Sequence, residues 1–428
     1  MRVLLVGGGG REHALADALA SSPELDELVA APGNPGIAAL GRCVPVAVDD
    51  PAAIAALADE VDAGLVIVGP EVPLVAGAVD AVQARGRLAF GPTAAAAQLE
   101  GSKAWMKELL ALIGVPTATH ATFGAGDEDA AFAYLERMSG SSYVVKTSGL
   151  AAGKGVVVTD SMGDARDAVH DYLSGAAFGD AGRTLVIEEG LSGPEVSLLV
   201  LCDGRDAVPL APAQDHKRVG DGDRGPNTGG MGAYSPVPVA GADVVEEAMA
   251  KAVRPTLDEL RLRGIDYRGI LYAGLMLTND GVKVIEYNVR FGDPECQVVI
   301  PRLESDLLRH CIESAGGRLE TEVGFRDDAC ITVVAVAEGY PAPVRGGDVI
   351  DGLEAAAGID GVTVFHAGTA RRDDGAIVTA GGRVLDVTAI APTIRDARDR
   401  AYAALDRISF PGMHYRHDIA GAALATRS

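Results

Sequence analysis

Apolar runs of strand length alternate with a helical pattern over the first hundred residues, and each run ends in glycine or proline. The first run, VLLV, leads through four glycines into a segment with Leu15, Ala18 and Leu19 on one helical face. Three more runs follow, in LVAAPGNPG, GLVIVGPEVPL and RLAFGPT. This alternation predicts a doubly wound parallel sheet, whose ligand crevice lies at the carboxyl ends of the strands. All four glycine-bearing turns should then lie along one edge.

The next pattern predicts a capped helix followed by two units of mixed strands and helices. Ser102 should cap a helix over residues 103–113, with Gly114 at its end and Pro116 beyond it. A small unit should follow near residues 115–190, and a larger sheet should run from EVSLLVLCDG to about residue 308. Residues 211–236 are polar and lack an apolar period, which predicts a long loop that is either functional or disordered.

The C-terminal part predicts a compact α+β domain over residues 325–421. It contains three apolar runs, ACITVVAVAEGYP, VTVFHAGTA and GGRVLDVTAIA, before an amphipathic segment, TIRDARDRAYAALDRI. A chain of 428 residues exceeds what one core usually supports. We therefore expect an α/β and α+β multidomain protein, with an N-terminal domain at 1–101, a central domain at 102–308 and this C-terminal domain.

The charge, hydropathy and cysteine content of the chain limit the kinds of partner that we expect. A net charge of −23 argues against nucleic acid, because binding a polyanion requires a cationic surface. No apolar run approaches the roughly 20 residues of a membrane span, and no leader pattern follows Met1, so we expect a cytoplasmic protein with no membrane partner. Five scattered cysteines without C-x-x-C spacing predict free, buried thiols.

The segment KTSGLAAGKGVVV, residues 146–158, resembles a phosphate-binding loop but departs from one in two ways. Gly149 is followed by three residues before Gly-Lys rather than four, and Gly155 replaces the hydroxyl residue that would touch magnesium. Strands are expected on both sides, so the segment predicts a glycine-rich hairpin that lays backbone N–H groups over a polyphosphate. Lys146 would add a point charge. The alternative is a flexible turn with solvated lysines.

The turn GGGGREHA, residues 7–14, invites a dinucleotide-binding interpretation that fails. Its third glycine is missing in either register, and the second strand ends in AAPGNPG without an acid to hold a ribose. The turn can still offer a helix N-terminus and Arg11 to a single phosphate. The alternative is a tight turn that packs a helix on the sheet.

The segment VIEYNVRFGDPE, residues 284–295, predicts a site for magnesium and phosphate. Strand period places Glu286, Asn288 and Arg290 on one face together with Val284, and turns Ile285, Tyr287 and Val289 to the other. Carboxylate and amide oxygens suit magnesium, and an arginine beside them can offset charge on a phosphoryl group. The alternative is a surface salt bridge between Glu286 and Arg290. In TLVIEEGLSGPEVS, backbone groups of 189–191 could bond an adenine edge, although such acids are commonly just solvated.

Taken in order, Lys103, Lys146 before its glycine hairpin, the hinge at 188–191, and Glu286 with Asn288 resemble the ATP-grasp architecture, in which two lobes clamp ATP. The chain also resembles the family of phosphoribosylamine-glycine ligases, in family order from residue 7 to about residue 370. The motifs that carry this resemblance are GGGGREHALA, APGNPG, VGPEVPLV, FGPTAAAAQLEGSKA, GLAAGKGV, QDHKRVGD, GPNTGGMGAYSP, LYAGLM, IEYNVRFGDPE and VFHAGT.

The resemblance implies ligation of glycine to 5-phosphoribosylamine, with ATP as co-substrate and glycyl phosphate as intermediate, on a central two-lobed domain whose lid spans about 118–190. It implies ATP contacts at Lys103, Lys146, Gly149, Gly153, Lys154, Gly155, Glu188, Glu189, Leu191 and Glu195. It implies Mg²⁺ or Mn²⁺ at Glu286 and Asn288. Substrate contacts would be Gly8, Gly9, Gly10, Arg11, Gly69, Pro70, Glu71, Asp215, His216, Arg218, Asn227, Thr228, Gly229, Gly230, Met231 and Gly292, with Arg290, Lys217 and Asp293 as catalytic residues.

The chain departs from the family pattern at four places. Thr147 and Ser148 stand where K-A-D-G has alanine and aspartate, and Gly190 replaces the aromatic of the E-E-F-L hinge. Cys296 replaces a threonine, and Gly8 an asparagine. None removes a proposed metal ligand, so we expect an active enzyme with small-molecule partners, as a monomer or weak homodimer. The alternatives are an ATP-grasp carboxylase, a nicotinamide dehydrogenase and an ATP-binding protein without turnover.

Overall fold

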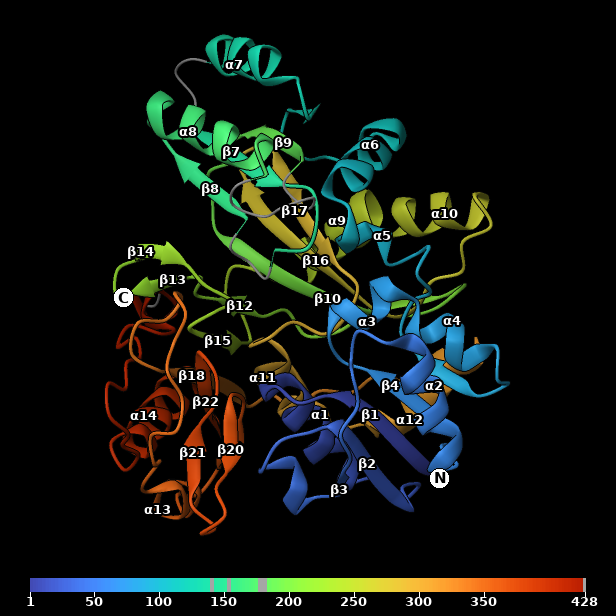
Figure 1. Cartoon of the computed structure of the whole chain (residues 1–428), viewed down its shortest axis with the longest axis vertical. Coiled ribbons are helices and arrows are strands. Elements are labelled where there is room, and N and C mark those ends of the chain that lie inside the picture. The colour runs from blue at the N-terminus through green and yellow to red at the C-terminus, as the bar shows by residue number, and fades with distance from the viewer. Residues whose placement is uncertain (139–141, 152–154, 176–182, 426–428) are drawn as a thin grey trace.

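The chain folds into three parts, which share one cleft. The computed structural model describes residues 1–138, 142–151, 155–175 and 183–425. Figure 1 shows the N-terminal part in blue at the lower right and the C-terminal part in red at the lower left. The central part lies above both, with a small lobe at its top. Within the described ranges, no helix combines the length and hydropathy needed to cross a bilayer.

The N-terminal part is a five-stranded parallel sheet, which confirms the doubly wound prediction. Its strand order is β3-β2-β1-β4-β5, and all of its pairs are parallel. Val3 and Leu5 enter one core cluster while Leu4 and Val6 enter another, as expected for a strand buried on both faces. The elements are β1 (Arg2–Gly7), α1 (Gly10–Ala20), β2 (Glu27–Pro32), η1 (Ile37–Ala39), β3 (Arg42–Cys43), α2 (Pro51–Glu60), β4 (Leu65–Val68), α3 (Glu71–Ala76), α4 (Ala78–Gln83) and β5 (Leu88–Phe90).

Two helices connect this sheet to the central part, α5 (Gln98–Gly101) and α6 (Lys103–Ile113). Ser102 is the N-cap of α6, and its Oγ accepts a hydrogen bond from Trp105 N at 3.2 Å. Gly114 ends the helix in the left-handed conformation, at φ 70°. The predicted helix is therefore confirmed at both ends, and Lys103 is its first residue.

The small upper lobe is a four-stranded antiparallel sheet with two helices packed on it (Figure 1). Its strand order is β6-β9-β7-β8, and Lys146 pairs with Val156 in the β7–β8 hairpin. The lobe has its own core, which includes Val145, Ile187 and Leu135. Its elements are β6 (His120–Gly124), α7 (Glu128–Arg137), β7 (Tyr143–Thr147), β8 (Val156–Thr159), α8 (Met162–Leu173) and β9 (Thr184–Glu189).

The floor of the central part is a second four-stranded sheet, in the order β11-β10-β16-β17. Its pairs are antiparallel, and α9, η3 and α10 cover one face (Figure 1). The elements are β10 (Glu195–Asp203), β11 (Ala207–Pro209), α9 (Ala242–Ala248), η3 (Met249–Val253), α10 (Arg254–Leu262), β16 (Arg268–Thr278), β17 (Gly281–Asn288), α11 (Cys296–Val299), η4 (Ile300–Arg302) and α12 (Leu307–Gly316).

One prediction about β17 is wrong. The pairing of β16 with β17 slips between Gly274, opposite Glu286, and Leu275, opposite Val284, which leaves Ile285 as an extra residue. Val284 therefore joins the same core cluster as Tyr287, rather than sharing a face with Glu286. Ile285 lines the cleft instead. Glu286, Asn288 and Arg290 still face the cleft together.

The C-terminal part is built on a five-stranded sheet, in the order β12-β15-β18-β22-β19. The segment 211–236 is therefore not the long loop that its polarity predicted, because it supplies two strands to this sheet and forms a two-stranded ribbon. The elements are β12 (Gln214–Asp215), β13 (Arg218–Gly220), β14 (Arg224–Asn227), β15 (Gly232–Ser235), β18 (Ala329–Val336), α13 (Leu353–Ala357), β19 (Val362–His366), β20 (Thr369–Arg371), β21 (Ile377–Thr379), β22 (Arg383–Ala391), α14 (Ile394–Leu405) and α15 (Gly421–Ala425).

The N-terminal and C-terminal parts meet through polar contacts made by α1 and the turn after β2. His366 N donates to His13 Nδ1 at 2.7 Å, and Asn34 Nδ2 donates to His366 O at 2.7 Å. Burial lowers the pKa of His13 to about 3, so the ring is neutral and free to accept this bond. All five cysteines are free thiols, as predicted, and only Cys43 is not fully buried.

Candidate active site

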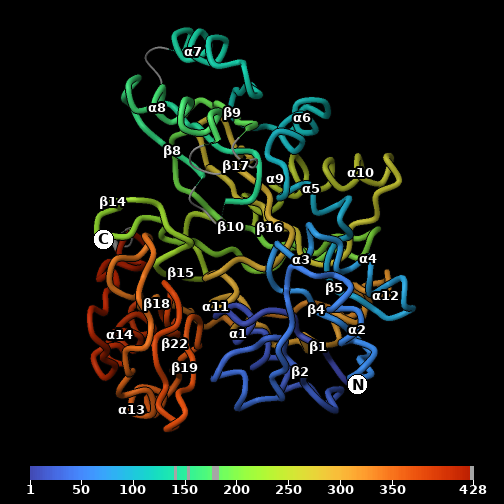
Figure 2. The backbone as a smooth tube through the Cα atoms, in the orientation of Figure 1, coloured from blue at the N-terminus to red at the C-terminus, as the bar shows by residue number. Residues whose placement is uncertain are grey.

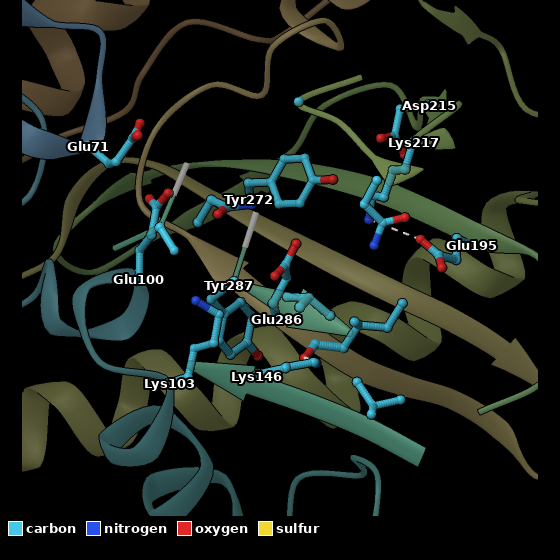
Figure 3. A pocket seen from close by; sticks show the side chains of 18 of the residues that line it. Glu71, Glu100, Lys103, Lys146, Glu195, Asp215, Lys217, Tyr272, Glu286 and Tyr287 are labelled. Carbon is cyan, nitrogen blue, oxygen red and sulfur yellow. Dashed lines mark hydrogen bonds and ion pairs between the residues drawn. The ribbon is translucent and has the colours of Figure 1, made fainter. Parts of the chain in front are cut away.

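A cleft of about 460 Å³ opens between the small lobe and the floor sheet, and every part of the chain contributes to its wall. The upper lobe supplies β7 and β9, the floor supplies β16 and β17, and the turns at Arg11 and Glu71 close one end. Figure 3 shows Glu286 pointing into the middle of this space, among Lys103, Lys146 and Lys217.

A buried carboxylate between two lysines lies where the upper lobe meets α6. Glu188 Oε2 is 3.1 Å from both Lys146 Nζ and Lys107 Nζ. Lys107 is fully buried and also donates to Thr117 Oγ1 at 2.6 Å. Burial lowers the pKa of Lys107 to about 8, although the charge of Glu188 opposes this. Burial would raise the pKa of Glu188, but the charges of the two lysines outweigh it and lower that pKa.

The wall beneath the hinge carries apolar side chains, which suit the face of an aromatic base. Gly190 N donates to Ser142 O at 2.7 Å, and a Cβ at Gly190 would lie 2.5 Å from Ser142 Cβ. Within the part of the chain that the structure describes, the N–H of Leu191 has no acceptor, so it can serve a ligand. The apolar residues that line this region are Leu99, Met106, Val144, Leu150, Val156, Val158, Leu191, Met276 and Ile285.

Ser148, which departs from the family pattern, connects the end of β7 to the start of α6. Its Oγ accepts a hydrogen bond from Ala104 N at 3.1 Å, and its carbonyl accepts one from Lys103 N at 3.0 Å. These bonds satisfy N–H groups that a helix leaves without partners in its first turn. Ser148 therefore fixes Lys103, and with it one of the cations of the cleft.

Glu286 and Asn288 offer two oxygen donors from one face of β17. Burial would raise the pKa of Glu286, but the charges of Lys217, Lys146 and Lys103 outweigh it, so the carboxylate is ionised. No group of three His, Cys, Asp or Glu residues that could hold a metal occurs among the described residues. A carboxylate and an amide fit a magnesium ion whose other ligands come from phosphates and water.

Arg290 is clamped between two carboxylates at one end of the cleft. Its Nη2 is 2.7 Å from Glu100 Oε1, and its Nε is 3.2 Å from Glu71 Oε2. Burial would lower the pKa of Arg290, but the two carboxylates raise it. These are the ion pairs that the structure shows for Arg290, so the alternative of a surface bridge to Glu286 is not observed. Nearby, Arg11 Nε lies 2.6 Å from Glu12 Oε1.

Asp293 lies at the junction of the central and C-terminal parts. Its Oδ2 is 3.1 Å from Arg383 Nη2, and Arg383 Nη1 donates to the carbonyls of Gly229 and Asp293 at 2.9 and 2.7 Å. Burial would raise the pKa of Asp293, but Arg383 and Arg11 outweigh it and lower that pKa. Arg383 therefore joins the polar segment and the GDPE turn at one point.

The polar segment brings Lys217 and Asp215 to the cleft. Lys217 Nζ is 2.9 Å from Glu195 Oε2, and Lys217 O accepts from Thr228 N at 2.8 Å (Figure 3 shows the ion pair). Burial raises the pKa of Asp215 to about 7, although Lys217 opposes it. Asp215 can therefore carry or release a proton near neutral pH.

Most of the predicted site residues line the cleft, but not all of them do. Gly153 and Lys154 lie outside the described residues. The others that do not line it are Gly8, Gly9, Gly10, Gly69, Gly149, His216, Arg218, Gly230, Met231 and Gly292. Several of these have packing roles, since Met231 is a core residue and a Cβ at Gly230 would lie 2.4 Å from Pro294 Cδ.

The cleft also contains polar residues that the sequence patterns did not single out. Glu295 Oε1 accepts from Ser197 Oγ at 2.9 Å and from Tyr272 OH at 2.8 Å, and it is buried. Glu100, which also lines the cleft, is buried, and so is Lys107 behind the cleft wall. A charged residue on the apolar face of a predicted helix is the signal that could have revealed Lys107.

Known proteins with similar sequence match nearly the whole length of the chain. Sequence models of the phosphoribosylglycinamide synthetase N, ATP-grasp (A) and C domains match residues 1–100, 101–296 and 330–422. The phosphoribosylamine–glycine ligase of Brucella melitensis is 53% identical over 420 residues, which is 98% of this chain and 97% of that protein. The ligase of Yersinia pestis is 48% identical over 429 residues, 99% of each chain.

Solved structures show the same arrangement. The phosphoribosylamine–glycine ligase of Thermotoga maritima is 32% identical, with a TM-score of 0.84 over 98% of this chain and 100% of that one. A biotin carboxylase domain from Hydrogenobacter thermophilus, solved with MgADP and bicarbonate, has a TM-score of 0.71 over 96% of this chain and 91% of that one. At 19% identity, this second likeness shows a shared fold alone.

Proposed function

The chain belongs to the phosphoribosylglycinamide synthetase family, and from that premise we propose that it ligates glycine to 5-phosphoribosylamine, with conversion of ATP to ADP and phosphate. The family resemblance and the ATP-grasp fold predicted from the motifs are thereby confirmed. One observation supports the proposal most directly. The lysines, the Glu-x-Asn pair and the polar segment, which lie far apart in the sequence, all line a single cleft.

The chemistry requires two successive transfers. A carboxylate is a poor electrophile, so a carboxyl oxygen of glycine first attacks the γ-phosphorus of ATP, and the bond to the β-phosphate oxygen breaks to release ADP. The amine of phosphoribosylamine then attacks the carbonyl carbon of glycyl phosphate. The C–N bond forms, the C–O bond breaks, phosphate leaves, and the nitrogen loses a proton. Positioning and electrostatics supply most of the catalysis in such steps.

The nucleotide end of the cleft is the part between the upper lobe and the floor. The apolar wall would hold the adenine, and the free N–H of Leu191 would bond its edge. Lys103 and Lys146 would meet the phosphates, each held in place by the bonds described above. Glu188 faces the two lysines rather than the hinge, so we assign it to placing Lys146, and we leave adenine to backbone groups.

Glu286 and Asn288 would hold the metal that accompanies the nucleotide. A bound Mg²⁺ would draw charge from the phosphate oxygens and so assist phosphoryl transfer. Glu286 lies among Lys103, Lys146 and Lys217, whose charges lower its pKa. Two of these lysines also pair with carboxylates, Lys146 with Glu188 and Lys217 with Glu195, so these cations are held in place where phosphate would enter.

The opposite end of the cleft would receive glycine and phosphoribosylamine. Arg290 and Asp293 lie there with Arg11 and Glu71, so both charges of the glycine zwitterion can be matched. Asp215 can take a proton from the attacking amine, because burial raises its pKa to about 7. Lys217, paired with Glu195, would offset charge on the acyl phosphate.

The substrate requirement for ADP release tests this function. Purified protein with magnesium and ATP should release ADP when glycine and phosphoribosylamine are both present, the latter formed in place from ribose 5-phosphate and ammonia. Bicarbonate, the substrate of the carboxylases with this fold, is the control. Release with bicarbonate in place of glycine, or ATP binding without turnover, would refute the substrate assignment and leave the fold untouched.

We also propose finer points that rest on the sequence. Either Mg²⁺ or Mn²⁺ should support the reaction, the protein should work in the cytoplasm, and it should be a monomer or weak homodimer. The proposed domain limits are 1–101, 102–308 and 325–421, with residues 214–235 completing the C-terminal sheet.

A further inference from the structure

A buried carboxylate that the reaction does not use lies beneath the substrate end of the cleft. Asp386 is in the middle of β22 and is fully buried. It faces the first turn of α1 so closely that a Cβ at Gly10 would lie 1.6 Å from its Oδ2. Asp386 thus comes from the C-terminal part, Gly10 from the N-terminal part, and the neighbouring Gln297 from the central part.

Gln297 connects this carboxylate to the site. Its Nε2 donates to Asp293 Oδ1 at 2.8 Å and to Asp386 Oδ2 at 2.9 Å. The remaining oxygens, Asp386 Oδ1 and Gln297 Oε1, are buried without a hydrogen-bond partner within the described part of the chain. One side-chain amide therefore spans two carboxyl groups, and one of these lines the cleft.

If Asp293 and Asp386 were both ionised, their two negative charges would not be balanced by nearby cations. Arg383 makes its ion pair with Asp293 at 3.1 Å, and Asp386 has no ion pair in the described ranges. The cross-strand partners of Asp386, Val334 on β18 and Phe365 on β19, are apolar. Among the described residues, the first turn of α1 at Gly10 faces Asp386 but makes no hydrogen bond to it.

An ionised carboxyl in such a place is costly, and proteins usually avoid the cost by protonation. Burial, together with the charge of Asp293, raises the pKa of Asp386 to about 7, although Arg383 opposes this. The pKa of Asp293 moves the other way, because Arg383 and Arg11 outweigh its burial. The two carboxyls are thus separated into one acid and one carboxylate.

We propose that Asp386 is a positioning residue that works as a neutral acid: through Gln297 it holds Asp293 in place for substrate without competing for Arg383. This inference rests on the proposed function, in which Asp293 lies at the glycine end of the cleft. Ionisation of Asp386 would add a second negative charge beside Asp293 and divide Arg383 and Gln297 between them. Glycine binding should therefore weaken as pH rises past neutrality.

The variant Asp386→Asn tests this directly, because an amide has the shape of the neutral acid and cannot ionise. At about pH 6 its kcat/KM for glycine should be within about twofold of wild type, and at about pH 8.5 it should exceed wild type by about tenfold. The substrates and Asp215 ionise in the same way in both proteins. The ratio of kcat/KM between variant and wild type therefore reports only the ionisation of residue 386. A ratio that does not change with pH would overturn the proposal, as would a folded variant that is inactive at pH 6.

Unfolding supplies a second readout that needs no activity. When folding raises the pKa of an acid, the folded protein becomes less stable as pH rises from the unfolded-state pKa to the folded-state pKa. For Asp386 this window runs from about 4 to about 7. The unfolding midpoint of wild type should therefore fall relative to Asp386→Asn across that window. The control is Asp373→Asn, an exposed carboxyl in the same part of the chain, whose difference from wild type should stay constant. A constant difference for Asp386→Asn as well would contradict the neutral acid.

Gln297→Met covers the case in which Asp386→Asn does not fold. It removes the amide that joins the two carboxyls, so KM for glycine should rise about tenfold at pH 6 with kcat little changed. An unchanged KM would overturn the positioning role. If wild type itself needs neither glycine nor phosphoribosylamine to release ADP, the proposed function fails, and the unfolding comparison still decides the state of Asp386.

Discussion

At the scale of residues, the cleft depends on charged side chains that hold one another in place. Glu188 lies 3.1 Å from two ammonium groups, and Thr117, which accepts from Lys107, donates in turn to Val284 O at 2.6 Å. This chain of contacts connects β9, α6 and β17. Removing one member would leave a buried charge without its partner, which typically costs about 3 kcal/mol or more. Lys146 is therefore presented to phosphate at a fixed point.

Glu286→Gln should abolish turnover while the fold persists. The substitution keeps the shape of the side chain but removes the negative charge among Lys103, Lys146 and Lys217, and with it the proposed metal ligand. We expect ADP release at saturating substrates to fall by about a hundredfold or more, and the metal requirement to rise by about tenfold or more.

The control for that measurement is Glu304→Gln, an exposed carboxyl in the same part of the chain, which should keep wild-type activity within about twofold. Circular dichroism should show the same helix and strand content in all three proteins. A normal metal requirement with retained turnover in Glu286→Gln would contradict the ligand assignment.

Some site residues could be predicted from the sequence segments in which they lie. Lys103 and Lys146 stand in polar or glycine-rich stretches, Glu286 and Asn288 were placed on one face by strand alternation, and each of the four lines the cleft. Lys107 was not singled out, although it lies on the apolar face of α6 with Met106 and Leu110, and the structure shows that it is fully buried.

At the scale of elements, β17 shows where periodicity fails. Strict alternation places Val284 and Glu286 on one face, but the extra residue at Ile285 moves Val284 into the core and keeps Tyr287 there too. A bulge depends on the partner strand as well as on the bulged one, so alternation in one segment does not reveal it. The consequence is local, because Glu286, Asn288 and Arg290 follow the bulge.

The polar segment shows the opposite case, in which a stretch without an apolar period is nevertheless ordered. Arg416 is almost fully buried, and its Nη1 donates to Asp223 Oδ1 at 2.7 Å and to Arg218 O at 3.1 Å. Its Nη2 pairs with Asp418, which also accepts from Gly222 N at 2.8 Å. Figures 1 and 2 show the ribbon lying against the C-terminal part, which supplies these contacts. No pattern within residues 211–236 could predict a partner some two hundred residues away.

Arg416→Gln should therefore loosen the β13–β14 ribbon. Losing a buried guanidinium that serves two carboxylates and a carbonyl should destabilise this docking by about 3 kcal/mol. Trypsin should then cleave after Arg224, which is exposed at the ribbon, roughly tenfold faster or more. KM for the substrates should also rise, because Lys217 and Thr228 flank the two strands of the ribbon.

The matched control is Arg372→Gln, an exposed arginine paired with Asp374, where stability and the rate of trypsin cleavage at the ribbon should stay close to those of wild type. Cleavage of the two variants at the same rate would show that the ribbon is held by other contacts.

At the scale of the whole molecule, three parts of the chain share one cleft. The order of strands and helices along the sequence predicted each part, because a parallel sheet, an antiparallel lobe and a C-terminal sheet have distinct patterns. Their junction was not predictable in the same way. The bonds from Arg383 to Asp293 and from His366 to His13 join residues about 90 and 353 positions apart, and no local pattern encodes such pairs.

Above all, we propose that this cleft moves a phosphoryl group from ATP to the carboxylate of glycine before the amide forms. Glycine labelled with oxygen-18 in its carboxyl group tests that claim most directly, by mass analysis of the phosphate released in the complete reaction. We predict one labelled oxygen in each phosphate, because the C–O bond of glycyl phosphate breaks when the amine attacks. Unlabelled phosphate alongside normal amide formation would contradict the acyl phosphate, and with it the mechanism assigned to this site.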